Sequence, residues 1–133
     1  MAKSNNIETK AIHAGRINDE QFGSLATPLY QTSTFIFENA QQGADRFAGE
    51  EEGFIYSRLG NPTTRQLEMR VAAMEGMEDA AATATGMGAV SGALLSYLQA
   101  GDHMIASKAI YGCSYALISH MLTRFGIEVT FVD

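Results

Sequence analysis

The second half of the chain carries apolar residues at helical spacing in three places. Each stripe repeats every three or four residues, the period of one face of an α-helix. The stripes are Leu67, Val71 and Met74; Val90, Leu94 and Leu98; and Leu117, Ile118, Met121, Leu122 and Phe125. The glycines Gly76, Gly101 and Gly126 follow them, as expected at helix ends. Asn61 before Pro62 gives the first helix a cap and a favoured first residue.

Short segments between these stripes predict three β-strands. Asp79–Thr85 is alanine-rich, His103–Ser107 is apolar, and Ile127–Val132 alternates apolar and polar residues. Residues 61–133 are therefore expected to follow the order α-β-α-β-α-β. Strands that are separated by helices pair in parallel through right-handed crossovers, so the predicted fold class is α/β with a mostly parallel sheet.

Residues 1–60 have no sustained periodicity. A brief strand at Thr34–Phe37 and a helix at Asn39–Phe47 are the regular elements expected there. Because so long an irregular segment is uncommon inside a compact domain, residues 1–60 are expected to form an extended arm that packs on a neighbouring subunit. A three-stranded sheet would leave an unpaired edge. The chain is therefore expected to be the N-terminal part of a larger protein, or one product of a split chain.

The composition narrows the class of protein. The 133 residues are 46% hydrophobic and 18% charged, with a formal net charge of −6, which is typical of a folded domain. Nine Lys and Arg residues are spread along the chain without a basic stripe, so nucleic-acid binding is not expected. No apolar run approaches the ~20 residues of a membrane helix. One cysteine and the lack of an apolar leader lead us to expect a cytoplasmic protein without a membrane partner. The three histidines show no metal-ligand spacing, so no metal partner is expected.

Gly86-Met87-Gly88 lies where a predicted strand leads into a predicted helix. The first N–H groups of a helix have no partners inside it, and together with the helix dipole they favour an anion such as a phosphate. The alternative is that these glycines only allow tight packing between the helix and the strand. The third glycine, Gly92, is one residue too far for the dinucleotide-binding pattern, and no Lys-Ser/Thr pair follows for a nucleotide P-loop.

Two further groups of residues have the side chains that ligand binding requires. Arg58 offers a planar fork for a phosphate or carboxylate and Tyr56 a hydroxyl, although a solvated arginine beside a packing tyrosine is the simpler interpretation. Tyr111 follows the carboxyl end of a predicted strand, where ligand crevices form in α/β sheets. It can stack on a flat ring or move a proton, or it can be a half-buried core aromatic. Cys113 is either a reactive thiol or a small apolar residue.

Taken together, these segments resemble the Cys/Met-metabolism enzymes that depend on pyridoxal 5′-phosphate (PLP). The resemblance runs from about Thr9 to Asp133, in the order and spacing of that family. It rests on the strings PLYQTSTFIF (28–37), GFIYSRLGNPTTRQLE (53–68), TATGMGAV (83–90), GDHMIASKAIYGCSYALI (101–118) and RFGIEVTFVD (124–133).

The resemblance implies an aspartate-aminotransferase-like fold, PLP fold type I. Such proteins have an extended N-terminal arm, a large α/β cofactor domain and a smaller C-terminal domain. The chain would supply the arm (residues 1–60) and the beginning of the PLP-binding domain (residues 61–133). The family usually forms homotetramers of two tight dimers.

The resemblance also implies roles for individual residues. Tyr56 and Arg58 match a pair that grips the cofactor phosphate of the neighbouring subunit. Gly86 and Met87 match backbone donors to the phosphate within the same subunit. Tyr111 matches an aromatic residue that stacks on the pyridine ring and gives a proton to the leaving thiol. A pKa of Tyr111 below ~10 is expected for that role, with Arg58 and the cofactor lowering it.

Cys113 matches a cysteine typical of the branch of the family that acts on L-methionine, where many relatives have glycine. The implied reaction is α,γ-elimination to methanethiol, 2-oxobutanoate and ammonia. Cleavage or synthesis of cystathionine and sulfhydrylation of homoserine esters are the alternatives, and a non-catalytic fragment is an alternative of another class. Lys3, Lys10 and Lys108 do not match the lysine that carries the cofactor, so the chain alone is expected to be inactive.

Overall fold

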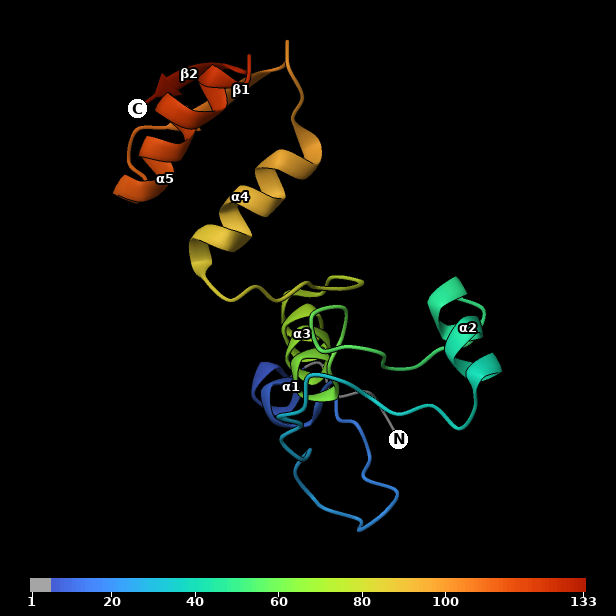
Figure 1. The fold of residues 1–133 in the computed structure, drawn as a ribbon. Helices are drawn as coiled ribbons and strands as arrows, with labels where there is room; N and C mark the ends of the chain where they lie inside the picture. The colour runs from blue at the N-terminus through green and yellow to red at the C-terminus, as the bar shows by residue number, and fades with distance from the viewer. Residues whose placement is uncertain (1–5) are drawn as a thin grey trace. The chain divides into compact units, whose positions relative to one another are not determined.

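The structure is a computed structural model that describes residues 6–133. The chain divides into two compact units, Met1–Ala82 and Thr83–Asp133. Its helices are α1 (Ile7–His13), α2 (Ala40–Ala48), α3 (Pro62–Glu75), α4 (Gly86–Tyr97), α5 (Gly112–Ala116) and the π-helical segment η1 (Leu117–Leu122), and its strands are β1 (His103–Ser107) and β2 (Glu128–Val132) (Figure 1). No helix among residues 6–133 is long and apolar enough to cross a membrane.

In the first unit, α1 packs against α3. Gly15, which follows α1 with φ +65°, lies so close to α3 that an added Cβ would stand 2.7 Å from the Cβ of Met69. Arg70 of α3 donates from Nε to the carbonyl of Ala14 at 3.1 Å. The glycine is therefore required twice, for its left-handed backbone and for the close approach of the two helices.

The start of α3 confirms the prediction made from its sequence. Asn61 accepts the N–H of Thr63 on its side-chain oxygen, Pro62 is the first helical residue, and Gly76 ends the helix with φ +71°. Asn61 is also buried, and its Nδ2 donates to the carbonyl of Tyr30 at 2.9 Å. The cap of α3 thus also fixes the irregular segment that precedes it.

The second unit is a small α/β layer. Strands β1 and β2 pair in parallel, from His103 opposite Glu128 to Ser107 opposite Val132. Ile118, Leu122 and Ile127 form the buried core between η1 and one face of the two strands. The parallel pairing confirms the predicted α/β class, and the predicted β1 agrees with the structure at both ends.

Several predicted elements differ from the structure. The strand expected at Asp79–Thr85 is wrong: within residues 6–133 it has no partner strand, and side chains of α3 bind its backbone and its first carboxylate instead. At Thr34–Phe37 there is one bridge, from Thr34 to Tyr56, rather than a strand. The last predicted helix begins earlier, at Gly112, and becomes π-helical at Leu117.

Residues 6–60 contain more regular structure than their patterning indicated. Helix α2 begins one residue after the predicted start because Asn39 is its cap and accepts the N–H of Gln42. Helix α1 was not predicted, since seven residues are too few to establish a period. The first compact unit extends to Ala82, beyond the predicted arm boundary at residue 60. That residues 1–60 pack on a neighbouring subunit stays a prediction.

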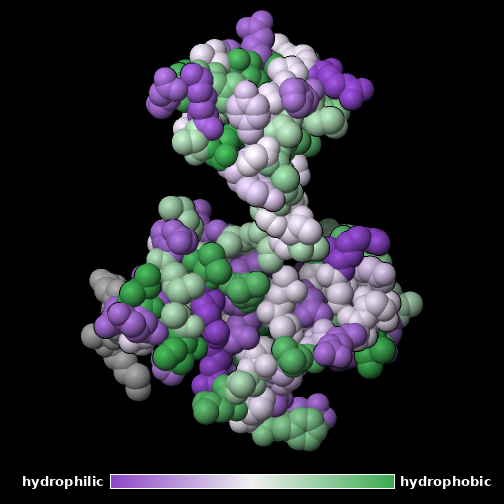
Figure 2. Space-filling model, turned by 90° about the vertical axis from the view of Figure 1, so that its left-hand side faces the viewer, coloured by the Kyte–Doolittle hydropathy of each residue, from purple (hydrophilic) through white to green (hydrophobic). Residues whose placement is uncertain are grey.

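Both units leave apolar side chains at their surfaces. Figure 2 shows hydrophobic residues among the exposed atoms of the face that it presents. The most exposed large apolar side chains are Phe22, Leu25, Leu29, Ile36 and Tyr97. Where exposed apolar side chains gather into a contiguous patch, they are typical of surfaces that contact further protein.

Candidate active site

The amino end of α4 presents unpaired N–H groups. Thr85 caps the helix: its Oγ1 accepts the N–H of Gly88 at 2.9 Å, and its carbonyl accepts the N–H of Ala89. Within residues 6–133, no hydrogen bond satisfies the N–H groups of Gly86 and Met87. Two donors at the positive end of a twelve-residue helix are an arrangement that binds an anion.

The two glycines of this turn differ in what surrounds them. A Cβ on Gly88 would stand 3.1 Å from Thr85 Oγ1, so Gly88 allows the cap to approach. A Cβ on Gly86 would meet nothing within 4 Å. Close packing within the described residues therefore explains Gly88 but not Gly86. The open space at Gly86 leaves room for a ligand against the backbone.

Tyr111 and Cys113 lie at the turn that leads from β1 into α5. Tyr111 is the residue before α5, and its side chain is 68% exposed. Cys113 is a free, exposed cysteine. A side-chain hydrogen bond with Cys113, together with charge repulsion from the same thiol, raises the pKa of Tyr111 above its ordinary value of 10.0. Tyr111 therefore keeps its proton at neutral pH. The sequence analysis expected a lowered pKa for Tyr111, but within this chain the pKa is raised.

The turn that carries Tyr111 is joined to the amino end of α4. Ser114, in α5, donates from its hydroxyl to the sulfur of Met87 at 3.6 Å. Gly86, Met87, Tyr111 and Cys113 are thus brought to one region of the second unit. No sequence pattern indicated this contact, because it joins residues 27 positions apart in different elements.

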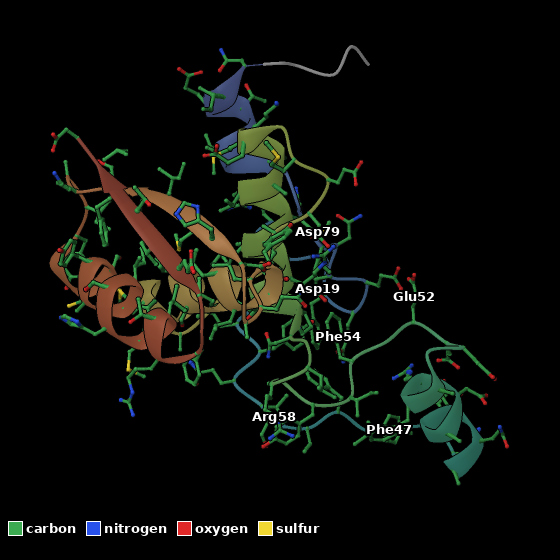
Figure 3. The ribbon with its side chains drawn as sticks, turned by 90° about the horizontal axis from the view of Figure 1, so that it is seen from above. Asp19, Phe47, Glu52, Phe54, Arg58 and Asp79 are labelled. Atoms are coloured by element: carbon green, nitrogen blue, oxygen red, sulfur yellow. The ribbon has the colours of Figure 1, made fainter. Side chains whose placement is uncertain are left out.

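Tyr56 and Arg58 lie in the first unit. Arg58 is exposed, and its guanidinium carbon stands 4.8 Å from the centre of the Tyr56 ring. In the part of the chain that the structure describes, Arg58 forms no ion pair. It contributes to the lining of a cavity of about 370 Å³ beside the start of α3, and Figure 3 marks its position. A guanidinium placed over an aromatic ring keeps its N–H groups available for a phosphate or carboxylate.

Backbone pairing fixes this segment locally. The N–H of Ser57 donates to the carbonyl of Ser33 at 2.8 Å, and that of Phe35 donates to Ile55 at 3.1 Å. The Thr34–Tyr56 bridge lies between these two bonds. The backbone position of Tyr56 is therefore fixed by pairing with residues 33–35.

These features define an α/β protein with two unpaired N–H groups at the amino end of α4 and an exposed arginine in the first unit. The chain belongs to the Cys/Met metabolism PLP-dependent enzyme family, whose model matches residues 8–133. That membership confirms the resemblance found in the sequence motifs.

Curated relatives of the chain carry out related chemistry. It is 58% identical over 131 residues to an L-methionine γ-lyase of Fusobacterium nucleatum subsp. polymorphum, covering 98% of this chain and 33% of the relative. It is 42% identical over 127 residues to an O-acetyl-L-homoserine sulfhydrylase of Corynebacterium glutamicum, covering 96% and 29%. The chain thus spans about a third of the length of the curated relatives it matches.

Solved structures match the fold as well. A putative O-acetylhomoserine (thiol)-lyase of Campylobacter jejuni, which contains a pyridoxyl-lysine phosphate group, gives a TM-score of 0.87 at 43% identity. It matches 96% of this chain and 32% of that protein. The cystathionine γ-lyase of Lactobacillus plantarum, complexed with L-serine, gives 0.80 at 34% identity, with 96% and 31% covered. The fold is that of the corresponding third of these enzymes.

Proposed function

We propose that this chain is the N-terminal part of a PLP-dependent carbon–sulfur lyase that converts L-methionine to methanethiol, 2-oxobutanoate and ammonia by α,γ-elimination. The support is family membership together with 53–58% identity to four L-methionine γ-lyases. By "full-length enzyme" we mean this chain joined to the remaining two-thirds of its own polypeptide.

The observation that carries the proposal is the pair of N–H groups at Gly86 and Met87 without a partner among residues 6–133, together with the open space at Gly86. A phosphate ester placed there would accept both hydrogen bonds and lie at the positive end of α4. The residues present therefore fit the phosphate of PLP. When bound, the cofactor supplies an electron sink for a carbanion formed on the substrate, while the protein supplies orientation and electrostatics.

Arg58 and Tyr56 are proposed to reach the phosphate of a second copy of the chain. The support is an exposed guanidinium that has no carboxylate partner among the described residues, although acidic residues outnumber basic ones 15 to 9. A planar fork of this kind binds phosphate oxygens in pairs. The proposed assembly is a homotetramer of two dimers, and the proposed location is the cytoplasm, where a free thiol such as Cys113 stays reduced.

Tyr111 is proposed to stack on the cofactor ring and to hold the proton that the leaving group needs. When the bond between the γ-carbon and sulfur breaks, the electron pair leaves with sulfur, and the sulfur takes the phenolic proton. With a pKa above 10.0, Tyr111 carries this proton at neutral pH. Contact with Arg58 of a second subunit would lower that pKa and so strengthen Tyr111 as an acid.

The related reactions of the family are the second candidate. Sulfhydrylases at 42–44% identity and a solved cystathionine γ-lyase at 34% identity favour it. Cys113, whose thiol interacts with Tyr111, is proposed to select methionine. The full-length enzyme carrying Cys113→Gly should then lose preference for methionine relative to cystathionine.

The proposal is tested by measuring methanethiol release from L-methionine and cleavage of L-cystathionine side by side. The full-length enzyme should bind PLP and release methanethiol faster than it cleaves cystathionine. Tyr111→Phe should lower methanethiol release by about a hundredfold, the usual contribution of a positioned general acid. A Tyr111→Phe enzyme with unchanged turnover would contradict the acid role. A full-length enzyme that binds PLP but acts only on cystathionine or a homoserine ester would place it with the sibling enzymes, and one that binds no PLP would contradict the proposal.

A further inference from the structure

Ser114 makes a side-chain contact between the two turns that carry the proposed site. It lies in α5, is 9% exposed, and directs its hydroxyl to Met87 Sδ at 3.6 Å. Among residues 83–133 this is the only side-chain hydrogen bond that joins α4 to α5. A buried serine hydroxyl bonded across elements restrains both of them, whereas one bonded to its own helix restrains neither.

Met87 is held at several of its atoms. Ser91 donates from Oγ to the carbonyl of Met87 at 2.7 Å, and Ser114 donates to its sulfur. The backbone N–H of Met87 remains unpaired. Because the side chain is directed to α5, the backbone N–H is the polar group that Met87 offers to a ligand.

The other end of the contact is close to Tyr111 along the chain. Ser114 is three residues after Tyr111, and the N–H of Tyr115 donates to the carbonyl of Tyr111 at 2.9 Å, which closes the first turn. The ring of Tyr115 also packs on Phe131 of β2, with centres 4.5 Å apart. This turn is therefore a defined unit, and fixing Ser114 fixes the backbone on which Tyr111 stands.

We propose that Ser114 is a positioning residue that sets the distance between the phosphate-binding N–H groups of α4 and the ring of Tyr111. The inference rests on the proposed function, since it concerns how the cofactor is held at both of its ends. Ser114 acts through Met87 and Tyr111 and does not itself touch the cofactor. The Ser114 hydroxyl takes no part in the reaction itself, and its role is to form the O–H···S bond to Met87.

The test is a double-mutant cycle in the full-length enzyme. Ser114→Ala removes the donor, Met87→Leu removes the sulfur acceptor at similar volume, and the double variant removes both. Ser114→Thr keeps the hydroxyl. Ser119→Ala is the matched control, because Ser119 Oγ bonds only the carbonyl of Tyr115, one turn earlier in the same helical run. The measurements are the PLP dissociation constant, the visible circular dichroism of bound PLP and the melting temperature.

Ser114→Ala should raise the PLP dissociation constant about fivefold, which corresponds to roughly 1 kcal/mol for one hydrogen bond, and should change the visible circular dichroism band. Met87→Leu should raise the PLP dissociation constant by the same factor, and the double variant should raise it no more than either single variant. Ser114→Thr and Ser119→Ala should give dissociation constants near that of the wild type. Additive effects, or a Ser114→Ala enzyme that melts earlier but binds PLP as Ser119→Ala does, would overturn the inference.

The wild-type enzyme separates this inference from the proposed function. If it binds PLP but releases no methanethiol, the proposed reaction fails, and the cycle on PLP binding still decides the role of Ser114. If it binds no PLP, both fail.

Discussion

At the scale of single residues, the neighbouring Cys113 thiol determines the direction in which the pKa of Tyr111 is shifted. A glycine at position 113 would leave the Tyr111 hydroxyl without the thiol as a partner. In this chain the thiol bonds the phenol and, when ionised, repels the phenolate, so the pKa of Tyr111 is raised. The folded chain therefore holds the phenolic proton to a higher pH than the unfolded chain does. The free energy of unfolding consequently falls as the pH rises from 10 toward the pKa of the folded state.

Replacing Cys113 by alanine should lower the pKa of Tyr111 toward 10.0, because the two largest of the three causes of the shift are removed with the thiol and only desolvation remains. An NMR titration of the tyrosine ring signals measures it. A Tyr111 titration that is the same with and without Cys113 would contradict the assigned cause.

The candidate residues could be predicted as residue types, but their surroundings could not. A glycine pair before a helical stripe indicates an anion site from local sequence. The openness of Gly86, the burial of Ser114 and the sulfur acceptor on Met87 depend on contacts between distant segments, which no local pattern encodes.

At the scale of elements, the predictions succeeded where capping chemistry was explicit and failed where an element needed a partner. Asn61, Pro62 and Gly76 fix α3 locally, so its bounds could be predicted. The alanine-rich segment Asp79–Thr85 has no such local signal, and its strand prediction assumed a neighbouring strand that the described residues do not contain.

The cap of α4 gives a prediction for that element. Thr85→Ala should destabilise the first turn by about 1 kcal/mol and weaken PLP binding in the full-length enzyme, because the loop that sets the free N–H groups loses its anchor. Thr85→Ser should behave as wild type. Thr123→Ala is the control, since Thr123 Oγ1 bonds only carbonyls of the preceding helical turn. Thermal melting and PLP titration measure the two effects, and a Thr85→Ala enzyme with unchanged PLP affinity would contradict the prediction.

The segment after α3 gives a pH prediction. Arg65 bonds Asp79 at 2.6 Å and lowers the pKa of that carboxyl below 3.8, while Glu68 accepts the N–H of Ala82 at 2.8 Å (Figure 3 labels Asp79). The Asp79 carboxyl is therefore protonated at a lower pH in the folded state than in the unfolded state. The stabilisation is thus present above pH 3.8 and lost as the pH falls through the pKa of folded Asp79.

Arg65→Gln should therefore raise the pKa of Asp79 toward 3.8, as followed by carboxyl-carbon NMR. Arg70→Gln is the matched control, because Arg70 bonds the carbonyl of Ala14 instead. An Asp79 titration unaffected by Arg65→Gln would show that the ion pair does not persist in solution.

At the scale of the whole molecule, the two sets of residues proposed to bind the phosphate lie in different compact units. Gly86 and Met87 belong to Thr83–Asp133, whereas Tyr56 and Arg58 belong to Met1–Ala82. The family resemblance assigns the two sets to neighbouring subunits. Sequence patterning predicted the α/β class of the second unit, but it could not predict which surfaces face another subunit, since exposed apolar residues mark contacts without naming the partner.

Mixing two variant subunits tests whether Arg58 and Tyr111 of one site come from different subunits. Arg58→Ala and Tyr111→Phe full-length enzymes, each of low activity, should regain activity when they are refolded together. In a mixed dimer, one of the two sites then receives both native side chains, about a quarter of all sites on random pairing. Each variant refolded alone is the control. No gain over the parent variants would mean that Arg58 serves its own subunit.

The central claim is that the amino end of α4 holds the phosphate of PLP. The most direct measurement is the electron density of the full-length enzyme after reconstitution with PLP. The account predicts phosphate oxygens at about 2.9 Å from the backbone nitrogens of Gly86 and Met87. A cofactor phosphate bound at another place, with both N–H groups facing solvent, would contradict it.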